Sequence, residues 1–268
     1  MLELLIIFGL AAIGSSLDLT GMDVQPEPDA AATEGDDTIT GTESDDLLHS
    51  LSGDDVVEAQ SGDDTVLAGA GDDVVLGRGG DDRLDGGSGD DLIKGGAGSD
   101  RLSGGDGMDD LRGAAGDDWL DGGDGADWLS GGDGDDILDG YWSPGAATGG
   151  YDLNDSYDPD LLRGEDGNDL VFGGSGDTLI GGAGTDTFVT GTWVDSDHAV
   201  EIGDFEEGQD QIVVTHFDSY GGPGVVDLET EGDDVHVLFD GATVARVTNG
   251  AGTVTLGDVS VIAVDDPV

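Results

Sequence analysis

A nine-residue repeat constrains the fold of this chain more than any other feature of its sequence. From Ala32 to Asp139 the chain divides into twelve consecutive nonapeptides without insertion or deletion. Position 6 of every nonapeptide is Asp, position 8 is always Ile, Leu or Val, and position 4 is Gly except at Ser44. Neither a helix nor a simple strand repeats every nine residues, so this period indicates a stack of short structural units.

The two halves of each nonapeptide predict different local structures. The glycine-rich half can adopt positive φ angles and turn tightly. The other half, such as DLI at 91–93, predicts a three-residue strand whose position-8 side chain points inward. Two nonapeptides then form one coil of 18 residues. Stacked coils would place the position-8 side chains in a narrow core between two parallel sheets, so we expect an all-β fold.

The invariant aspartate at position 6 predicts a bound cation. Alternate nonapeptides lie on the same side of the stack, so their turns are expected to be ~4.8 Å apart. Two carboxylates at that distance repel by roughly 1 kcal/mol in water and ~3–4 kcal/mol at an effective dielectric constant of 20. A divalent cation between them reverses the sign. Ca²⁺ accepts 6–8 oxygen ligands, whereas Zn²⁺ prefers nitrogen or sulfur and Mg²⁺ a tighter octahedron. Solvated acidic turns, the alternative, do not explain why position 6 is invariant beside a variable position 3.

The repeat resembles a known family. The pattern GGxGxDxUx, with U a large apolar residue, occurs in full at 86–94, 95–103, 104–112, 122–130, 131–139 and 181–189. It is similar to the RTX, or hemolysin-type, calcium-binding repeat. The resemblance implies a right-handed parallel β-roll with several Ca²⁺ ions held by position-6 side chains and by backbone carbonyls of positions 1–4 in adjacent turns.

Mapped onto this chain, the resemblance implies specific ligands. The side-chain ligands are Asp73, Asp82, Asp91, Asp100, Asp109, Asp118, Asp127, Asp136, Asp160, Asp169, Asp177 and Asp186. The backbone carbonyl ligands are those of Gly86, Gly89, Gly95, Gly98, Gly104, Gly107, Gly122, Gly125, Gly131 and Gly134. The strongest positions run from Asp91 to Asp136, in the pairs Asp91 with Asp109, Asp100 with Asp118, Asp109 with Asp127, and Asp118 with Asp136. The earlier nonapeptides depart from the consensus, so we do not expect full occupancy before about Asp73.

Charge and composition favour cations as partners. The chain has 62 Asp and Glu against 7 Lys and Arg, for a net charge of −55, and it has no cysteine. A chain so acidic stays disordered unless something neutralises it. No basic cluster is present to meet phosphate groups, so we expect no nucleic-acid partner.

The remaining segments are assigned by composition. Residues 1–17 are apolar and form either a leader, cleaved or tethering, or a segment packed on the protein; residues 18–31 read as a linker. Residues 32–139 form the roll, 140–154 an insertion rich in aromatic residues, and 155–189 four further repeats. Residues 190–268 alternate apolar and polar residues, with hairpin signals at Asp240-Gly241 and Asn249-Gly250. We expect an antiparallel β-rich cap there, and its resemblance to segments after RTX rolls implies a type I secretion signal.

Catalytic motifs are missing from the sequence. It contains neither HExxH nor GxSxG, and no carboxylate pair stands apart as an acid–base dyad. We expect a secreted, extracellular and non-enzymatic protein that folds on binding Ca²⁺ outside the cell, in which the type I secretion apparatus is a partner. The alternative is a cell-surface adhesin or polysaccharide-binding module that uses the 140–154 loop and the C-terminal sheets. A hydrolase or an epimerase-associated module within 190–268 is a third hypothesis.

Overall fold

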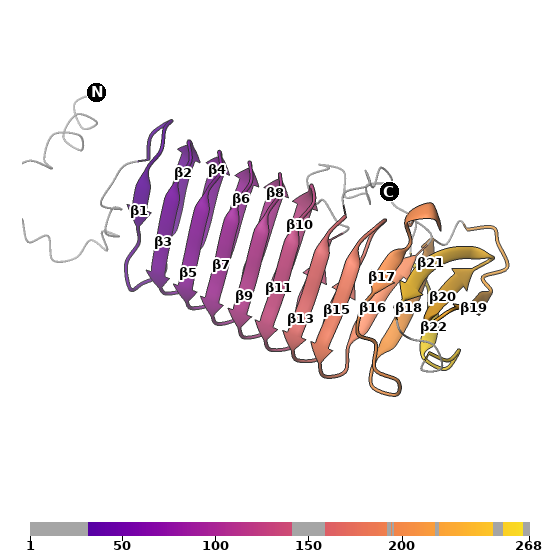
Figure 1. Cartoon of the computed structure of the whole chain (residues 1–268). Coiled ribbons are helices and arrows are strands. Elements are labelled where there is room, and N and C mark those ends of the chain that lie inside the picture. Colours follow the sequence, from indigo (N-terminus) through magenta and orange to yellow (C-terminus); the bar gives the residue numbers. More distant parts are fainter. Residues whose placement is uncertain are drawn as a thin grey trace, which may run out of the picture.

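The structure is a long, two-sided stack of strands. The computed structural model describes residues 32–140, 159–191, 194, 196–217, 220–248 and 254–264. Within these ranges the only helical element is the 3-10 turn η1, Ser196–His198. No helix in this part of the chain is long and apolar enough to span a membrane. Figure 1 shows the strands following one another along the molecule, from β1 at one end to the C-terminal strands at the other.

Consecutive strands alternate between two sheets. The twelve-stranded sheet contains, in spatial order, β1 (Thr38–Thr40), β3 (Val56–Ser61), β5 (Val74–Gly79), β7 (Leu92–Ala97), β9 (Asp110–Ala115), β11 (Trp128–Asp133), β13 (Leu161–Asp166), β15 (Thr178–Ala183), β17 (Val200–Ile202), β21 (Ala242–Val247), β20 (Asp234–Phe239) and β19 (Val226–Glu231). The ten-stranded sheet contains β2 (Leu47–Ser52), β4 (Thr65–Ala70), β6 (Arg83–Ser88), β8 (Arg101–Asp106), β10 (Trp119–Asp124), β12 (Ile137–Asp139), β14 (Leu170–Phe172), β16 (Thr187–Gly191), β18 (Gln211–Phe217) and β22 (Val259–Val264).

The register confirms the predicted parallel roll. Neighbouring strands of the repeats pair in parallel, with position 8 opposite position 8, as in Leu84, Leu102 and Leu120. The position-8 side chains from Ile39 to Phe188 are only 0–3% exposed and form one continuous core. Positions 7 and 9 point the other way, onto the outer faces of the sheets.

The strands are longer than the sequence predicts. Three-residue strands are expected, but most strands of the roll have six residues. The prediction was wrong because positions 1 to 3 also pair across coils, as Gly87 does with Gly105. The turn is therefore confined to positions 4 to 6. Position 2 takes a positive φ even where its residue is not Gly in most later nonapeptides, as at Gln60 (86°) and Arg78 (84°), which explains the preference for glycine there.

Stacking continues across the insertion. Strand β11 pairs with β13, and β12 pairs with β14, on either side of residues 141–158. Those residues lie outside the described part of the chain, so the predicted aromatic loop at 140–154 is not described beyond Gly140. Residues 1–31 are also outside it.

The C-terminal cap is antiparallel only in part. Strands β17, β18 and β22 extend the two sheets in parallel, and β21 pairs with β17 in parallel. Among the described strands only the pairs β19–β20 and β20–β21 are antiparallel. The hairpin predicted at Asp240-Gly241 joins β20 to β21, with positive φ at both residues (50° and 87°). The Asn249-Gly250 signal lies outside the described residues.

Candidate metal sites

Position-6 aspartates form two continuous rows along the roll. In each row the backbone N–H of one aspartate donates to Oδ1 of the next, at 2.6–3.0 Å. One row is Asp37, Asp55, Asp73, Asp91, Asp109, Asp127, Asp160 and Asp177. The other is Asp46, Asp64, Asp82, Asp100, Asp118, Asp136, Asp169, Asp186 and Asp210.

The rows contain all twelve aspartates predicted from the sequence and bring together each predicted pair. They also join residues on the two sides of the insertion, since Asp127 donates to Asp160 and Asp136 donates to Asp169. From Asp55 to Asp186 the members are only 1–4% exposed.

The second carboxylate oxygen is buried without a hydrogen-bond donor in most of the row. This holds for Oδ2 of Asp55, Asp64, Asp73, Asp82, Asp91, Asp100, Asp109, Asp118, Asp136 and Asp169. A desolvated carboxylate oxygen without a partner is costly in a folded protein. The recurrence of such an atom from one nonapeptide to the next therefore points to positively charged ligands.

Glycine at position 1 leaves space around this oxygen. A Cβ atom built on Gly86 would collide with Asp91 Oδ2 and lie 2.8 Å from the carbonyl oxygen of Gly104 in the next coil. Gly104 shows the same arrangement with Asp109 and the carbonyl of Gly122. Carboxylate and carbonyl oxygens therefore face a common hollow that any other residue would fill.

The position-4 carbonyls pack differently. The carbonyl oxygen of Gly89 lies against Gly107, and that of Gly107 against Gly125. Within the described residues no three His, Cys, Asp or Glu side chains converge on one point. A cation in these rows would thus need backbone oxygens as well as carboxylates, and an all-oxygen donor set fits Ca²⁺.

Burial raises the pKa of the carboxylates in the middle of the rows. The pKa of Asp91 rises to about 7, mainly through desolvation and then through the negative charges of Asp109, Asp73 and Asp72, against the hydrogen bond from Asp73. The pKa of Asp118 also rises to about 7, and those of Asp100 and Asp109 to about 6, again mainly through desolvation. A cation would relieve the cost of keeping these groups ionised.

Position 5 supplies a second ladder that the sequence reasoning missed. The backbone N–H of Asp90 donates to Oδ1 of Asp72 in the preceding coil, at 3.0 Å, and the same contact recurs along the roll at 2.8–3.1 Å. The position-6 bonds run the opposite way, from Asp73 to Asp91. Position 5 is Asp in most nonapeptides, and that frequency was the available signal.

At the ends of the rows Oδ2 accepts hydrogen bonds from neighbouring residues of the chain. Oδ2 of Asp46 accepts hydrogen bonds from the N–H and the hydroxyl of Thr42, at 2.6 and 2.9 Å. Oδ2 of Asp37 accepts the same two hydrogen bonds from Thr33. At the other end Oδ2 of Asp177 accepts from Gly174 N–H. Threonine at position 2 thus supplies the donors to Oδ2 in the first two nonapeptides.

Asp210 was also missed. It ends the second row, where Oδ1 accepts from Asp186 N–H at 3.0 Å and Oδ2 accepts from Glu206 N–H at 2.7 Å. Its segment lacks the glycine pattern, but Asp210 and Ile212 keep the spacing of positions 6 and 8.

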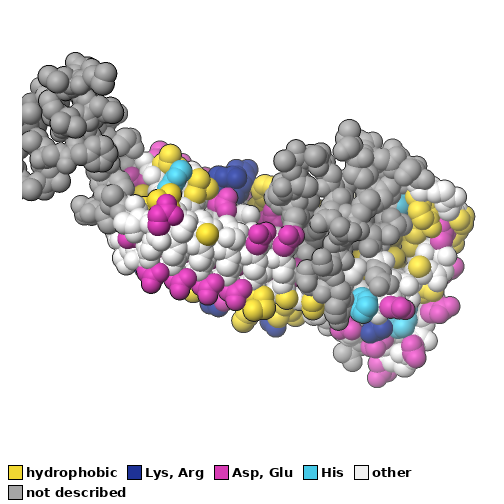
Figure 2. Space-filling view, turned by 90° about the horizontal axis from the view of Figure 1, so that it is seen from above, with side chains coloured by type: hydrophobic (Ala, Val, Ile, Leu, Met, Phe, Trp, Pro, Cys, Tyr) yellow, Lys and Arg dark blue, Asp and Glu magenta, His cyan; other side chains and the backbone are white. Residues whose placement is uncertain are grey.

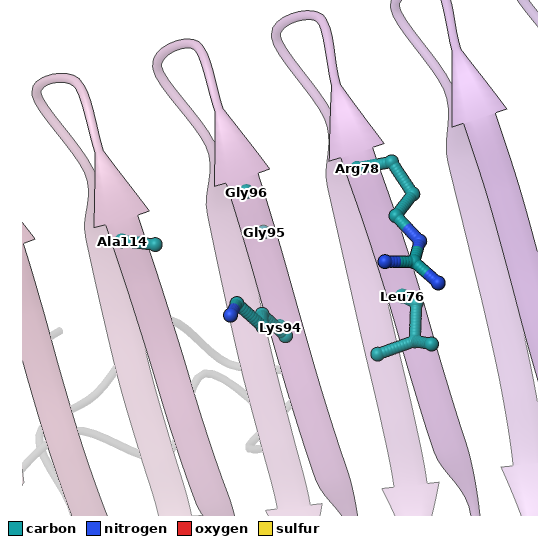
Figure 3. A pocket seen from close by; sticks show the side chains of 6 residues that line it. All are labelled: Leu76, Arg78, Lys94, Gly95, Gly96 and Ala114. Atoms are coloured by element: carbon teal, nitrogen blue, oxygen red, sulfur yellow. The ribbon is translucent and has the colours of Figure 1, made fainter.

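The outer faces of the sheets carry the few cationic side chains. In Figure 2 the dark blue Lys and Arg groups lie at the two long flanks of the roll. On the twelve-stranded sheet a hollow of about 240 Å³ is lined by Leu76, Arg78, Lys94 and the backbone around Gly95 and Gly96 (Figure 3). Arg78 is already paired with Glu58 at 2.7 Å. We therefore interpret this hollow as part of the packing of the outer face and not as a ligand site.

Comparison with known families agrees with the geometry. Residues 31–142, in overlapping segments, match the model of the RTX calcium-binding nonapeptide repeat. These coils are RTX calcium-binding repeats. Residues 163–248 match the model of the peptidase M10 serralysin C-terminal region, so the RTX roll is followed by a serralysin-like C-terminal domain.

Whole-chain comparisons add little. No curated protein sequence matches the chain. The solved structures that match include the extracellular lipase LipA from Serratia marcescens, 20% identical over 68% of this chain and 40% of that chain, with a TM-score of 0.24. The chain therefore spans less than half the length of that lipase, and a TM-score this low says nothing about shared fold or activity.

Proposed function

We propose that this protein is a secreted, non-enzymatic RTX roll whose folding is driven by Ca²⁺ outside the cell. The observation that carries the proposal is the row of buried Oδ2 atoms without hydrogen-bond donors. The RTX repeat match supports calcium as the ion, because the donors are all oxygen.

The position-6 side chains and the position-1 carbonyls would hold the ions. Calcium would supply the positive charge that lets neighbouring coils stack. Oδ1 of each aspartate accepts the backbone N–H of the aspartate one coil earlier, and this bond orients Oδ2 toward the hollow at the position-1 glycine. Folding and binding are then one process, since the unfolded chain does not assemble this arrangement.

Secretion through a type I system follows from the same chemistry. RTX repeats followed by a serralysin-like domain are typical of proteins secreted by this route. Extracellular calcium modules bind at about 10⁻⁴–10⁻³ M, so the chain would stay unfolded in a calcium-poor cytosol and fold outside.

The test is a calcium titration of the chelator-treated full chain, followed by far-UV circular dichroism, with Mg²⁺ as the control ion. We expect a cooperative coil-to-β transition at about 0.1–1 mM Ca²⁺ and none with Mg²⁺. A β-rich spectrum already present in chelator and unchanged by Ca²⁺ would refute the proposal.

The non-enzymatic part is tested separately. The sequence offers no HExxH or GxSxG motif, which supports it. The calcium-loaded protein is expected to show no turnover of casein, p-nitrophenyl esters or p-nitrophenyl glycosides above a heat-inactivated control. Turnover of any of these substrates would contradict it.

A further inference from the structure

A hollow on the outer face of the ten-stranded sheet has a different composition from the rest of the roll. It has a volume of about 160 Å³ and lies over β6, β8 and β10. Its outward-facing lining residues are Arg83, Asp85, Arg101, Ser103, Trp119 and Asp121. None of them belongs to the position-6 rows.

Strand register places these residues in two parallel columns. Arg83, Arg101 and Trp119 are Cα partners at position 7. Asp85, Ser103 and Asp121 are Cα partners at position 9. Between the columns Leu84, Leu102 and Leu120 point into the core, so the two outward columns form the sides of the hollow.

The polar side chains of the hollow form no hydrogen bonds with one another, and the interaction between Arg83 and Asp85 is confined to charge: burial raises the pKa of Asp85, and the arginine charge lowers it against that rise. Within the described residues, no hydrogen bond or ion pair engages the side chains of Arg83, Asp85, Arg101, Ser103 or Asp121. The twelve-stranded sheet differs, because there Arg78 pairs with Glu58 at 2.7 Å and Arg112 with Asp110 at 2.6 Å. Groups kept apart at the surface of a hollow are available to a ligand.

Asp121 is the side chain of the hollow whose environment is least satisfied. It sits at an outward position, yet it is only 5% exposed. Its Oδ1 atom is buried and accepts no hydrogen bond. Leaving a buried acceptor unsatisfied costs about 1–3 kcal/mol, so a donor from a bound molecule would be favourable here.

Charge and shape restrict the class of that molecule. Arg83 and Arg101 face Asp85 and Asp121, and burial raises the pKa of Asp121 to about 8, with the negative charges of Asp139, Asp127 and Asp85 adding to the shift. The lining therefore carries at most one net positive charge near neutral pH, which does not select a strongly charged molecule. Trp119 adds an aromatic surface, with the Arg101 guanidinium 6.0 Å from its ring centroid. The volume is well below the roughly 300–1,000 Å³ of pockets for drug-sized ligands, so it suits a single ring.

We propose that this hollow is a saccharide-binding site that holds one neutral sugar ring. Sugar hydroxyls donate to Asp121 and Asp85 and accept from Arg83 and Arg101, while the apolar face of the ring packs on Trp119. The hollow is open at the surface and the columns run along the roll, so the ring can belong to a longer glycan. None of its lining residues belongs to the calcium rows or to residues 140–154.

The test uses the calcium-loaded full chain and isothermal titration calorimetry with neutral hexasaccharides of glucose: cellohexaose, laminarihexaose and maltohexaose. At least one is expected to bind. Trp119→Ala and Ser103→Leu, which fills the hollow without removing a charge, are each expected to weaken binding at least tenfold. Trp128→Ala is the matched control, because Trp128 occupies position 7 of the next nonapeptide on the opposite sheet and is 46% exposed; it should bind like the parent protein.

The calcium transition of each variant is measured by circular dichroism in parallel, so that loss of binding is separated from loss of folding. Absence of binding by all three hexasaccharides overturns the proposal. So does equal weakening by Trp119→Ala and Trp128→Ala, or binding that is confined to acidic polygalacturonate. None of these outcomes would contradict the proposal of calcium-driven folding, because that proposal rests on the position-6 aspartates and not on the residues of this hollow.

Discussion

The two carboxylate oxygens of Asp91 have different environments. Oδ1 accepts the N–H of Asp73 at 2.8 Å, whereas Oδ2 is buried without a donor near the carbonyl of Gly104. Asp46 differs, because Thr42 already donates twice to its Oδ2. The same residue type at the same repeat position therefore has two roles, which substitution can separate.

Asp91→Asn is expected to raise the calcium concentration at mid-transition at least threefold. The asparagine keeps an acceptor for Asp73 N–H but removes the charge that binds the ion. Asp46→Asn should change the midpoint less than twofold. Calcium titrations followed by circular dichroism measure both, and equal midpoint shifts in the two variants would contradict the assignment.

We expect position 1 to require glycine because a Cβ atom would not fit there, and not because the backbone needs a conformation that only glycine adopts. Gly86→Ala puts a methyl group against Asp91 Oδ2 and the Gly104 carbonyl, and we expect a loss of about 1–3 kcal/mol in urea unfolding at saturating calcium. Gly79→Ala is the matched control, since its nearest contact would be the Ala97 carbonyl oxygen at 3.8 Å. It should be neutral or stabilise by up to about 1 kcal/mol; a comparable loss in both would refute the steric explanation.

At the scale of the strand, the sequence predicts stacking better than it predicts length. The spacing from Asp91 to Ile93 identifies the turn ligand and the core residue, and the structure confirms the parallel roll built on that spacing. The six-residue strands were missed because glycine favours turns, yet the backbone of Gly87 pairs with Gly105. Asp210 was missed because tertiary contacts, not a glycine pattern, bring it into the row.

Strand β16 connects the roll to the C-terminal cap. Phe188 is fully buried and pairs with Val171 of β14 and Ile212 of β18. Phe188→Ala is expected to cost about 3–5 kcal/mol, as for other buried aromatic residues. The loss should appear both in urea unfolding with calcium and as a higher calcium midpoint, because more ion is needed to offset it.

Thr187→Ala is the control for this strand. Its side chain is on the outer face, so we expect a change within about 0.5 kcal/mol. A similar loss in the two variants would mean that the strand's backbone, and not the packing of Phe188, joins the roll to the cap.

At the scale of the whole molecule, the buried carboxylates couple folding to pH. Their folded pKa values of about 6 to 7 lie above the ordinary value of 3.8. The metal-free fold therefore binds protons more tightly than the unfolded chain does. The contribution of these carboxylates to its stability is fully present below about pH 4 and is lost as the pH rises through 6 to 7.

In chelator, we expect the β content by circular dichroism to increase as the pH falls from 8 to 5. With calcium the order reverses, because the ion binds the deprotonated carboxylates. The calcium midpoint should fall as the pH rises from 5.5 to 7.5. A midpoint independent of pH across this range would show that these carboxylates do not titrate with folding.

The alternation of strands between two sheets limits how such a chain can grow or shrink. Removing one nonapeptide would move every later strand to the opposite sheet and exchange the positions of β17 and β18 beneath the cap. Removing two, such as 86–103, would restore every pairing and shorten the rod by one strand spacing, ~4.8 Å. The length of the roll can therefore change only in steps of one whole coil. Duplication or loss of a pair of nonapeptides would change this length and leave the structure of both ends unchanged.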